Sequence, residues 1–235
     1  MILQGPEFYI SKRMGRAIMD HAMLAEGDRI AIALSGGVDS LTLLQVMRDR
    51  KSFVPIHYHL VAVHIDTGTS KKTLRALARF CDTLGVPFHS FKPGRSKDDT
   101  HAAFSWFYGK RREELLRQAQ RLQCNTIALG QHKDDVVETM LLRMFFAGTV
   151  SVLPAHERIS PQLSVIRPMV YVEKTLIRSF VKTADFPAIA LKENSSDAAK
   201  RRSIAAMIRT IEKTCPEVKT NISRSLTRVK KDYLL

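Results

Sequence analysis

Three short polar segments have residue types that could bind or transfer a charged group, and each follows an apolar run. They are Ser35–Ser40 (SGGVDS), His64–Gly68 and Gly130–Asp135. In the first segment, Gly36 and Gly37 have no side chain to keep an anion away from the backbone. A helix that begins at such a loop offers unpaired N–H groups and a partial positive charge to that anion. The pattern therefore predicts a phosphate-binding loop.

Carboxylates in these segments suit a magnesium ion. Asp39 could cap the following helix or hold Mg2+ against phosphate oxygens, and the adjacent Asp134 and Asp135 could also hold the ion. His132, just before them, could donate to a phosphate. Acidic residues at a helix start also favour the helix dipole when no ligand is present, so a purely structural role stays open. Asp39, Asp134 and Asp135 are the candidate catalytic and magnesium-binding residues.

The glycine-containing loop differs from two common nucleotide motifs. It lacks the G-x-x-x-x-G-K-[ST] spacing, and no lysine follows its glycines. It also lacks the G-x-G-x-x-G pattern of dinucleotide-binding folds. A plain strand-to-helix turn, capped by a serine or an aspartate, is the alternative interpretation.

The elements that must position these segments alternate along the chain. Apolar runs predict five strands, and apolar residues at helical spacing predict helices between them. Such alternation is typical of an α/β fold, here a parallel five-stranded sheet with helices on both faces. Ligands bind such sheets beyond the carboxyl ends of the strands, where all three polar segments are expected. The predicted strands are Arg29–Leu34, Tyr58–Ile65, Val86–Phe91, Asn125–Leu129 and Val165–Arg167.

The distribution of charge indicates a polyanionic partner, although a charged helix face is solvated by default. The 235 residues include 37 Lys and Arg against 23 Asp and Glu, a formal charge of +14. Such a field attracts nucleic acid. We expect residues 1–190 to form the main domain, including an N-terminal helix, and residues 191–235 to form a basic helical extension. The candidate nucleic-acid contacts are Lys110, Arg111, Arg112, Arg201, Arg202, Arg224 and Arg228.

Several classes of protein are disfavoured. No apolar run approaches the roughly 20 residues that span a bilayer, and the first residues lack the layout of a signal peptide. We therefore expect a cytoplasmic protein that does not contact membranes. Cys81, Cys124 and Cys215 lie far apart in the sequence, which argues against a disulfide framework and against a cysteine-rich zinc site.

The loop and three other segments resemble a known family. SGGVDS, between a hydrophobic strand and a helix, resembles the PP-loop of the ATP-pyrophosphatases. GQHKDDVVETMLLRMFFAG (Gly130–Gly148) is similar to the G-H-H-x-D-D-x-x-E-T segment of the tRNA-modifying members, and IRPM (Ile166–Met169) to their I-R-P-L strand. The stretch Met14–Ser40 resembles the corresponding part of the tRNA 2-thiocytidine synthetases.

This resemblance implies a fold, an activity and a nucleotide site. The fold is adenine nucleotide alpha-hydrolase-like. The implied activity is ATP-dependent modification of a tRNA base by adenylylation of a pyrimidine carbonyl, with AMP and pyrophosphate as products. ATP and Mg2+ are the implied cofactors and tRNA is the implied partner, with a sulfur donor protein and a second copy of the chain as further candidates. The implied nucleotide contacts are Leu34, Ser35, Gly36, Gly37, Val38, Asp39, Ser40, His64, Asp66, Gly130 and His132.

The chain departs from the 2-thiocytidine synthetases in one respect. Those enzymes carry two C-x-x-C pairs that hold an iron–sulfur cluster, whereas this chain has Phe104 and Phe107 at the first pair and no cysteine near Leu191 and Asn194. Thiolates select such clusters, so we expect no iron–sulfur cluster. Three alternatives remain beside thiolation: a lysidine-type amine transfer to tRNA, a PP-loop ligase for a small molecule, and a non-catalytic paralogue that binds ATP or RNA.

Overall fold

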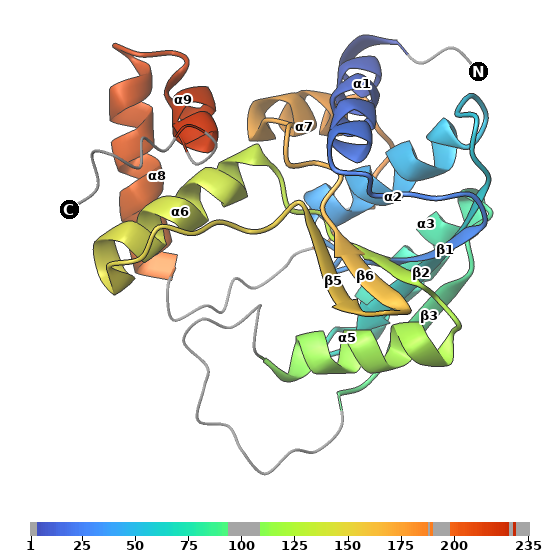
Figure 1. Ribbon diagram of the computed structural model, residues 1–235. Helices are drawn as coiled ribbons and strands as arrows, with labels where there is room; N and C mark the ends of the chain where they lie inside the picture. Colours follow the sequence, from blue (N-terminus) through green and yellow to red (C-terminus); the bar gives the residue numbers. More distant parts are fainter. Residues whose placement is uncertain (1–3, 94–108, 188, 190–197, 226–227, 229–235) are drawn as a thin grey trace.

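A six-stranded sheet forms the centre of the protein (Figure 1). The computed structural model describes residues 4–93, 109–187, 189, 198–225 and 228. The strands follow one another across the sheet in the order β3-β2-β1-β4-β6-β5. They are β1 (Asp28–Ala33), β2 (Tyr58–Ile65), β3 (Phe88–Phe91), β4 (Thr126–Ala128), β5 (His156–Ser160) and β6 (Leu163–Ile166).

The strand order reverses beside β1. From β1 the chain adds β2 and β3 on one side, and it then returns to add β4 on the other side. Both neighbours are parallel to β1, and Ile30 is in register with Leu60 of β2 and with Thr126 of β4. Ligands bind α/β sheets at such a switch point, beyond the carboxyl ends of the strands. The segments that follow β1 and β4 are Ser35–Ser40 and Gly130–Asp135, so the fold brings these two segments together.

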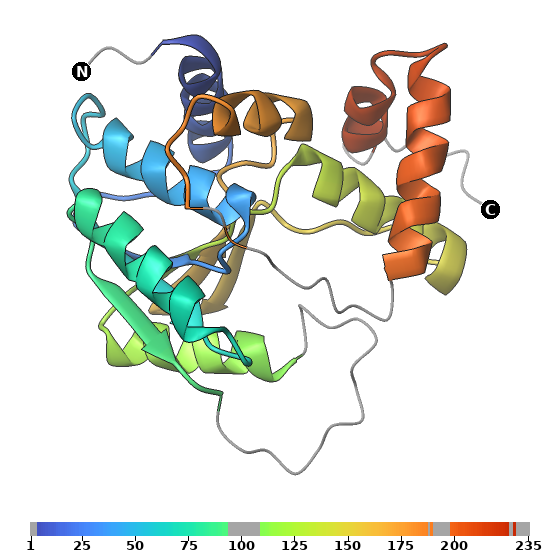
Figure 2. The ribbon, with the colours of Figure 1, turned by 180° about the vertical axis from the view of Figure 1, so that it is seen from behind.

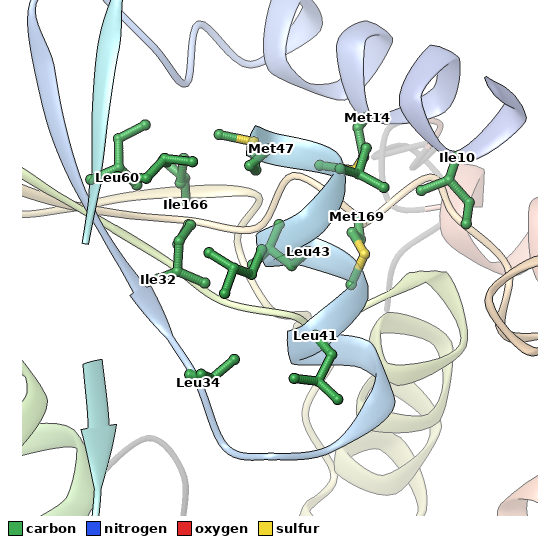
Figure 3. Close-up of a cluster of buried hydrophobic side chains, with 14 of the residues drawn as sticks. Ile10, Met14, Ile32, Leu34, Leu41, Leu43, Met47, Leu60, Ile166 and Met169 are labelled. Carbon is green, nitrogen blue, oxygen red and sulfur yellow. The ribbon is translucent and has the colours of Figure 1, made fainter. Parts of the chain in front are cut away.

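Helices cover both faces of the sheet, as the sequence predicts. The covering helices are α1 (Gly5–Asp20), α2 (Val38–Arg50), α3 (Lys71–Thr83), α5 (Lys110–Arg121) and α7 (Lys174–Val181). Successive residues of a strand point to opposite faces. Ile30 and Ile32 therefore pack with α1, α2, α3 and α7, whereas Ala31 packs with α5 on the other face. Figures 1 and 2 show the helices on the two sides of the sheet. Figure 3 shows the first of these cores, where apolar side chains of α2 meet those of β1, β2 and β6.

Three further helices pack together beside the sheet. They are α6 (Lys133–Ala147), α8 (Ala198–Glu212) and α9 (Val218–Ser225). Their apolar side chains, among them Val137, Ile204 and Val218, form a separate small core. Figure 1 shows α8 and α9 against α6, away from the sheet. None of the helices in the described ranges is long and apolar enough to cross a membrane.

The prediction of five parallel strands needs one correction. β5 is a sixth strand, and it pairs with β6 in the antiparallel orientation. Its residues, HERIS, are exposed or half-buried at the edge of the sheet. A polar edge strand of this kind has no apolar run by which it could be predicted. The other strands are parallel, and the α/β fold class is confirmed.

Candidate active site

The loop between β1 and α2 is held by its own serine hydroxyls. The Gly37 N–H donates to Ser35 Oγ (3.2 Å), and the Ser40 hydroxyl donates to the Gly37 carbonyl (2.8 Å). Gly36 has a φ of +91°, a conformation that glycine adopts without steric cost. Gly37 is the N-cap of α2 and supplies no side-chain cap, and the Val38 N–H has no acceptor among the described residues. The N-terminus of α2 is therefore open to an anion.

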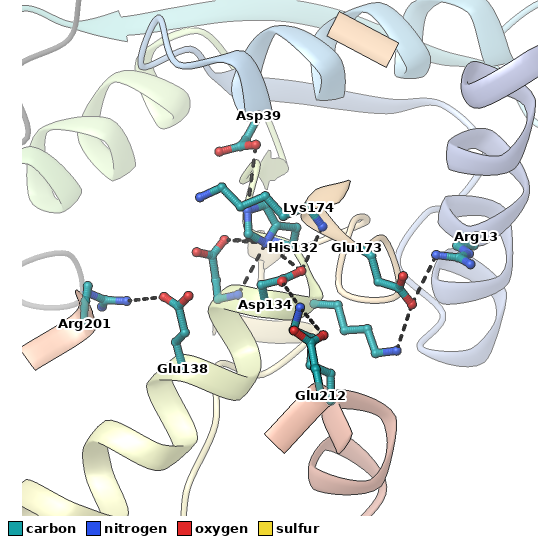
Figure 4. A network of polar contacts seen from close by, with 12 residues as sticks. Arg13, Asp39, His132, Asp134, Glu138, Glu173, Lys174, Arg201 and Glu212 are labelled. Carbon is teal, nitrogen blue, oxygen red and sulfur yellow. Dashed lines mark hydrogen bonds and ion pairs between the residues drawn. The ribbon is translucent and has the colours of Figure 1, made fainter. Parts of the chain in front are cut away.

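The segment after β4 lies directly against this loop. A Cβ atom on Gly130 would come within 3.1 Å of the Asp39 carbonyl and of Ser40 Cα. Contacts this short are tighter than ordinary van der Waals packing, so the absence of a side chain lets the two backbones approach each other. This close approach brings His132 beside the first turn of α2 (Figure 4).

His132 is the N-cap of α6 and forms a capping box with Asp135. The Asp135 N–H donates to His132 Nδ1 (3.4 Å), while the His132 N–H donates to Asp135 Oδ2 (2.9 Å). Because Nδ1 accepts in this box, the ring proton lies on Nε2. That Nε2 atom is buried 3.8 Å from Asp39 Oδ1, and neither atom has a hydrogen-bond partner in the part of the chain that the structure describes. The two atoms thus lie beside the loop with their hydrogen-bonding capacity unused.

The surroundings of Asp39 disfavour its charge. Burial is the main cause and raises the pKa of this carboxyl. His132 and Lys174 act against this rise, while Asp135 adds to it. A cation at Asp39 would relieve the cost of burying this carboxylate. The site suits Mg2+, which takes one or two carboxylates together with phosphate oxygens.

Asp134 is in a different environment from Asp39. Its Oδ1 atom pairs with the ammonium group of Lys219 on α9 (2.8 Å), and its Oδ2 atom accepts from the N–H of Lys174 on α7 (2.8 Å). Burial opposes ionisation, but these two contacts together lower the pKa of Asp134. Asp134 therefore joins α6 to α7 and α9. Within the described ranges, no three His, Cys, Asp or Glu side chains are arranged to hold a metal ion.

Known proteins share this combination of fold and loop. The sequence pattern of the family described as PP-loop domain matches residues 9–211. This chain belongs to the PP-loop domain family. The prediction of an ATP-using PP-loop enzyme is thereby confirmed.

Two relatives resemble the PP-loop chain over nearly its whole length. The tRNA-cytidine(32) 2-sulfurtransferase of Geobacter sulfurreducens is 35% identical over 235 residues, which cover 96% of this chain and 91% of the relative. The protein of the same name from Geotalea uraniireducens is 33% identical, over 96% of this chain and 93% of the relative.

Solved structures share the fold at low sequence identity. The U34-tRNA thiolase NcsA from Methanococcus maripaludis, with its [4Fe-4S] cluster, has a TM-score of 0.75 at 18% identity and covers 95% of this chain and 79% of its own. The NH3-dependent NAD synthetase from Campylobacter jejuni has a TM-score of 0.52 at 13% identity and covers 98% of this chain and 90% of its own. These likenesses establish the fold alone.

In the PP-loop chain, His64 and Asp66 form hydrogen bonds that stabilise the backbone at the end of β2. His64 is buried, its Nδ1 atom donates to the Leu34 carbonyl (2.7 Å), and its Nε2 atom accepts from the Thr69 hydroxyl (2.9 Å). The N–H groups of Thr69 and Gly68 donate to Asp66 Oδ1, and they lower the pKa of that carboxyl. Both residues hold backbone next to the loop, and their contact with a nucleotide stays a prediction.

The basic residues on the C-terminal helices are exposed. Arg201 and Arg202 lie on α8, and Arg201 approaches Glu138 of α6 (3.9 Å). Arg224 and Arg228 are exposed near the end of the described chain. Exposure leaves these side chains accessible to a large anionic partner, and their contact with tRNA stays a prediction.

Arg111 and Arg112 of α5 make internal contacts instead. Arg112, with 17% of its side chain exposed, pairs with Glu157 of β5 (2.9 Å). Arg111 donates to the Ile65 carbonyl at the end of β2 (3.4 Å). Lys110 begins α5, and its side chain lies outside the described part. These contacts join α5 to the sheet, and a role of these residues in tRNA binding stays a prediction.

Arg167, Lys174 and Lys219 shape the site without belonging to the predicted set. Arg167 is 1% exposed and donates to the Gln131 side chain and the Pro154 carbonyl (both 2.5 Å). It thereby fixes the segment that leads into α6, and burial lowers its pKa to about 10. A charged residue directly after an apolar strand is a signal that could have indicated Arg167. The two lysines have no comparable local signal.

The three cysteines of the chain occupy three different cores. Cys81 packs in the core that contains α2 and α3, Cys124 in the core beneath α5, and Cys215 against the cluster of α6, α8 and α9. Burial raises the pKa of Cys81 to about 12 and also raises that of Cys124. The cysteines therefore do not converge. The positions of the C-x-x-C pairs of 2-thiocytidine synthetases lie outside the described residues: Phe104, Phe107, Leu191 and Asn194.

Proposed function

We propose that this PP-loop chain catalyses ATP-dependent thiolation of a cytidine in tRNA. One observation carries the proposal. At the open N-terminus of α2, Asp39 Oδ1 and the nearby His132 Nε2 have no hydrogen-bond partner within the described ranges, and the chain is 35% identical to a tRNA-cytidine(32) 2-sulfurtransferase over 96% of its length. Such a site has the donors to hold a triphosphate and the acceptor to hold its counter-ion.

The first step we propose is adenylylation of the base. The carbonyl oxygen of the cytidine attacks the α-phosphorus of ATP, a new O–P bond forms, and the bond from this phosphorus to the pyrophosphate oxygen breaks. Such a transfer depends mainly on positioning and on stabilisation of charge. The loop Ser35–Ser40 and the N-terminus of α2 supply backbone N–H groups for the phosphates. The base must lie in a loop or leave its stack to reach them.

Asp39 and Asp135 fit a magnesium ion better than Asp134 does, because Lys219 and Lys174 already occupy both oxygens of Asp134. When bound, Mg2+ would offset the charge that builds on the departing pyrophosphate. The buried Nε2–H of His132 donates to a phosphate oxygen on the same side. Asp134 then acts by fixing α6, α7 and α9 around the site.

In the second step, a sulfur nucleophile displaces AMP. A C–S bond forms at the activated carbon, and the C–O bond to AMP breaks. The donor set of this chain does not fit an iron–sulfur cluster, because its three cysteines lie in three different cores. We therefore propose that the chain holds no such cluster and receives sulfur from a separate donor protein.

We propose that tRNA binds to the C-terminal helices. Exposed arginines lie on or beside α8 and α9, and both helices pack on α6, which begins at the proposed active site. We propose that residues 1–190 form the main domain and residues 191–235 form a basic extension. The arginines proposed to contact phosphates are Arg201, Arg202, Arg224 and Arg228.

The dispersed cysteines favour one other function, a lysidine-type transfer in which an amine displaces AMP. The activation step is the same, and only the nucleophile differs. Analysis of the tRNA product separates the two. We would incubate the protein with ATP, Mg2+ and bulk tRNA that lacks thiolated cytidine, and add either free lysine or inorganic sulfide, which replaces the sulfur delivered by the donor protein. The digested nucleosides would then be analysed by mass spectrometry. Thiolated cytidine supports the proposal, a lysine adduct supports the alternative, and unmodified cytidine in both reactions contradicts both.

A further inference from the structure

We propose that Lys174 binds the pyrophosphate portion of ATP and supplies the cation that the SGGVDS loop lacks. This inference rests on the proposed function, since it assigns one more contact within the same nucleotide site. No lysine follows the glycines of the loop. Lys174 enters the site from α7, far away in the sequence.

The backbone of Lys174 is fixed at the site. Lys174 is the first residue of α7, and its N–H donates to Asp134 Oδ2 (2.8 Å). Because Asp134 lies in the first turn of α6, this bond ties the start of α7 to the helix that His132 caps. Figure 4 shows the Lys174 side chain extending beside His132 toward Asp39.

The ammonium group of Lys174 has no direct partner in the part of the chain that the structure describes. It forms no hydrogen bond or ion pair with any described residue, whereas two neighbouring lysines are each paired twice. Lys133 contacts Glu173 and Thr220, and Lys219 contacts Asp134 and Glu212. A half-buried ammonium group is normally satisfied by an acceptor. Lys174 therefore has donor capacity that a bound anion could use.

The charge of Lys174 nevertheless reaches the site. Its positive field acts against the rise in the pKa of Asp39, and it does the same at Glu138 of α6. In both cases burial is the main cause of the raised pKa. The ammonium group thus lies among carboxylates of α2 and α6 without closing an ion pair with either.

Three polar groups without a hydrogen-bond partner among the described residues therefore lie in one region: Lys174 Nζ, His132 Nε2 and Asp39 Oδ1. The first two are donors and the third is an acceptor. A pyrophosphate group with its divalent cation satisfies all three, because phosphate oxygens accept from Lys174 and His132 while the cation binds Asp39. Asp39 lies in the first turn of α2, and the N-terminus of that helix also favours a negatively charged ligand.

The role of Lys174 is tested by comparing pyrophosphate with AMP. Calorimetric titrations with Mg2+ would use the wild type, Lys174→Met, Lys174→Gln and Lys174→Arg. Lys182→Met is the matched control, since Lys182 is exposed at the other end of α7. Loss of a charge-assisted hydrogen bond weakens binding by about tenfold to hundredfold. We expect this loss of pyrophosphate affinity in Lys174→Met and Lys174→Gln, and a smaller loss in Lys174→Arg. The affinity of all three variants for AMP should change little.

Unchanged pyrophosphate affinity in Lys174→Met and Lys174→Gln, with a wild type that binds both probes, would overturn this inference and leave the proposed function intact. Equal weakening of AMP binding and pyrophosphate binding would also overturn it, since that result indicates a general structural role of Lys174. A wild type that binds neither AMP nor pyrophosphate would overturn the proposed function as well.

Discussion

The Nε2 atom of His132 lies 3.8 Å from Oδ1 of Asp39, and both atoms are buried without a hydrogen-bond partner in the described chain. Buried polar atoms are normally satisfied, so an unpaired set beside an open helix N-terminus indicates a site built for a ligand. His132 also caps α6 through its other nitrogen. One side chain thus has a structural role and a proposed binding role, and substitutions can separate them.

His132→Asn should separate the two roles, because asparagine is a good N-cap but cannot place a donor where Nε2 lies. We expect this variant to keep most of the wild-type stability and to lose about tenfold or more in ATP affinity. His132→Ala should lose the same affinity and about 1 kcal/mol of stability. Denaturant unfolding and ATP titration measure the two effects. An Asn variant that binds ATP like the wild type would remove His132 from the nucleotide site.

Gly130→Ala should weaken ATP binding, because its Cβ would lie 3.1 Å from the backbone of the loop and push the loop away. Gly148→Ala is the matched control. Gly148 has a φ of +62° at the far end of α6, so alanine there should cost about 1 kcal/mol of stability through backbone strain. Affinity for ATP should fall in the first variant only. A parallel loss in both variants would mean that affinity follows stability.

Lys219→Met should destabilise the protein at neutral pH by about 2 kcal/mol, because it leaves Asp134 buried without its cation. The pKa of Asp134 is lowered in the folded state, so its ion pair stabilises the fold above the ordinary value of 3.8. That contribution is lost as the pH falls through the lower folded pKa. The difference between variant and wild type should therefore shrink as the pH falls below 3.8.

Urea unfolding at several pH values measures this difference. Lys213→Met is the control for Lys219→Met, since Lys213 is exposed just after α8. The control should unfold like the wild type. A pH-independent difference between Lys219→Met and the wild type would show that the pair with Asp134 is not its source.

Arg202→Gln should weaken tRNA binding and lower its dependence on salt. A residue that contacts one phosphate contributes about one counterion to the salt slope. Lys51→Gln is the control, because Lys51 is exposed at the end of α2, away from the C-terminal helices. Filter binding at several salt concentrations gives both slopes. Equal slopes for Arg202→Gln and the wild type would place the tRNA elsewhere on the surface.

Much of this fold could be predicted from local pattern. The strands around β1 are buried on both faces, so they appear in the sequence as apolar runs, whereas the polar edge strand β5 does not. The loop Ser35–Ser40 is recognisable because the residues that would bind phosphate follow one another in the sequence. Lys174 and Lys219 were missed because their partners belong to other helices. Only the tertiary arrangement of α6, α7 and α9 brings each lysine to Asp134.

The central claim, adenylylation of tRNA, is tested most directly by resolving the products of ATP labelled at the α-phosphate. The wild type with Mg2+ should form AMP and pyrophosphate only when tRNA is present, and Asp39→Asn should lower that rate by about hundredfold. Formation of ADP and phosphate, or of AMP at the same rate without tRNA, would contradict the account.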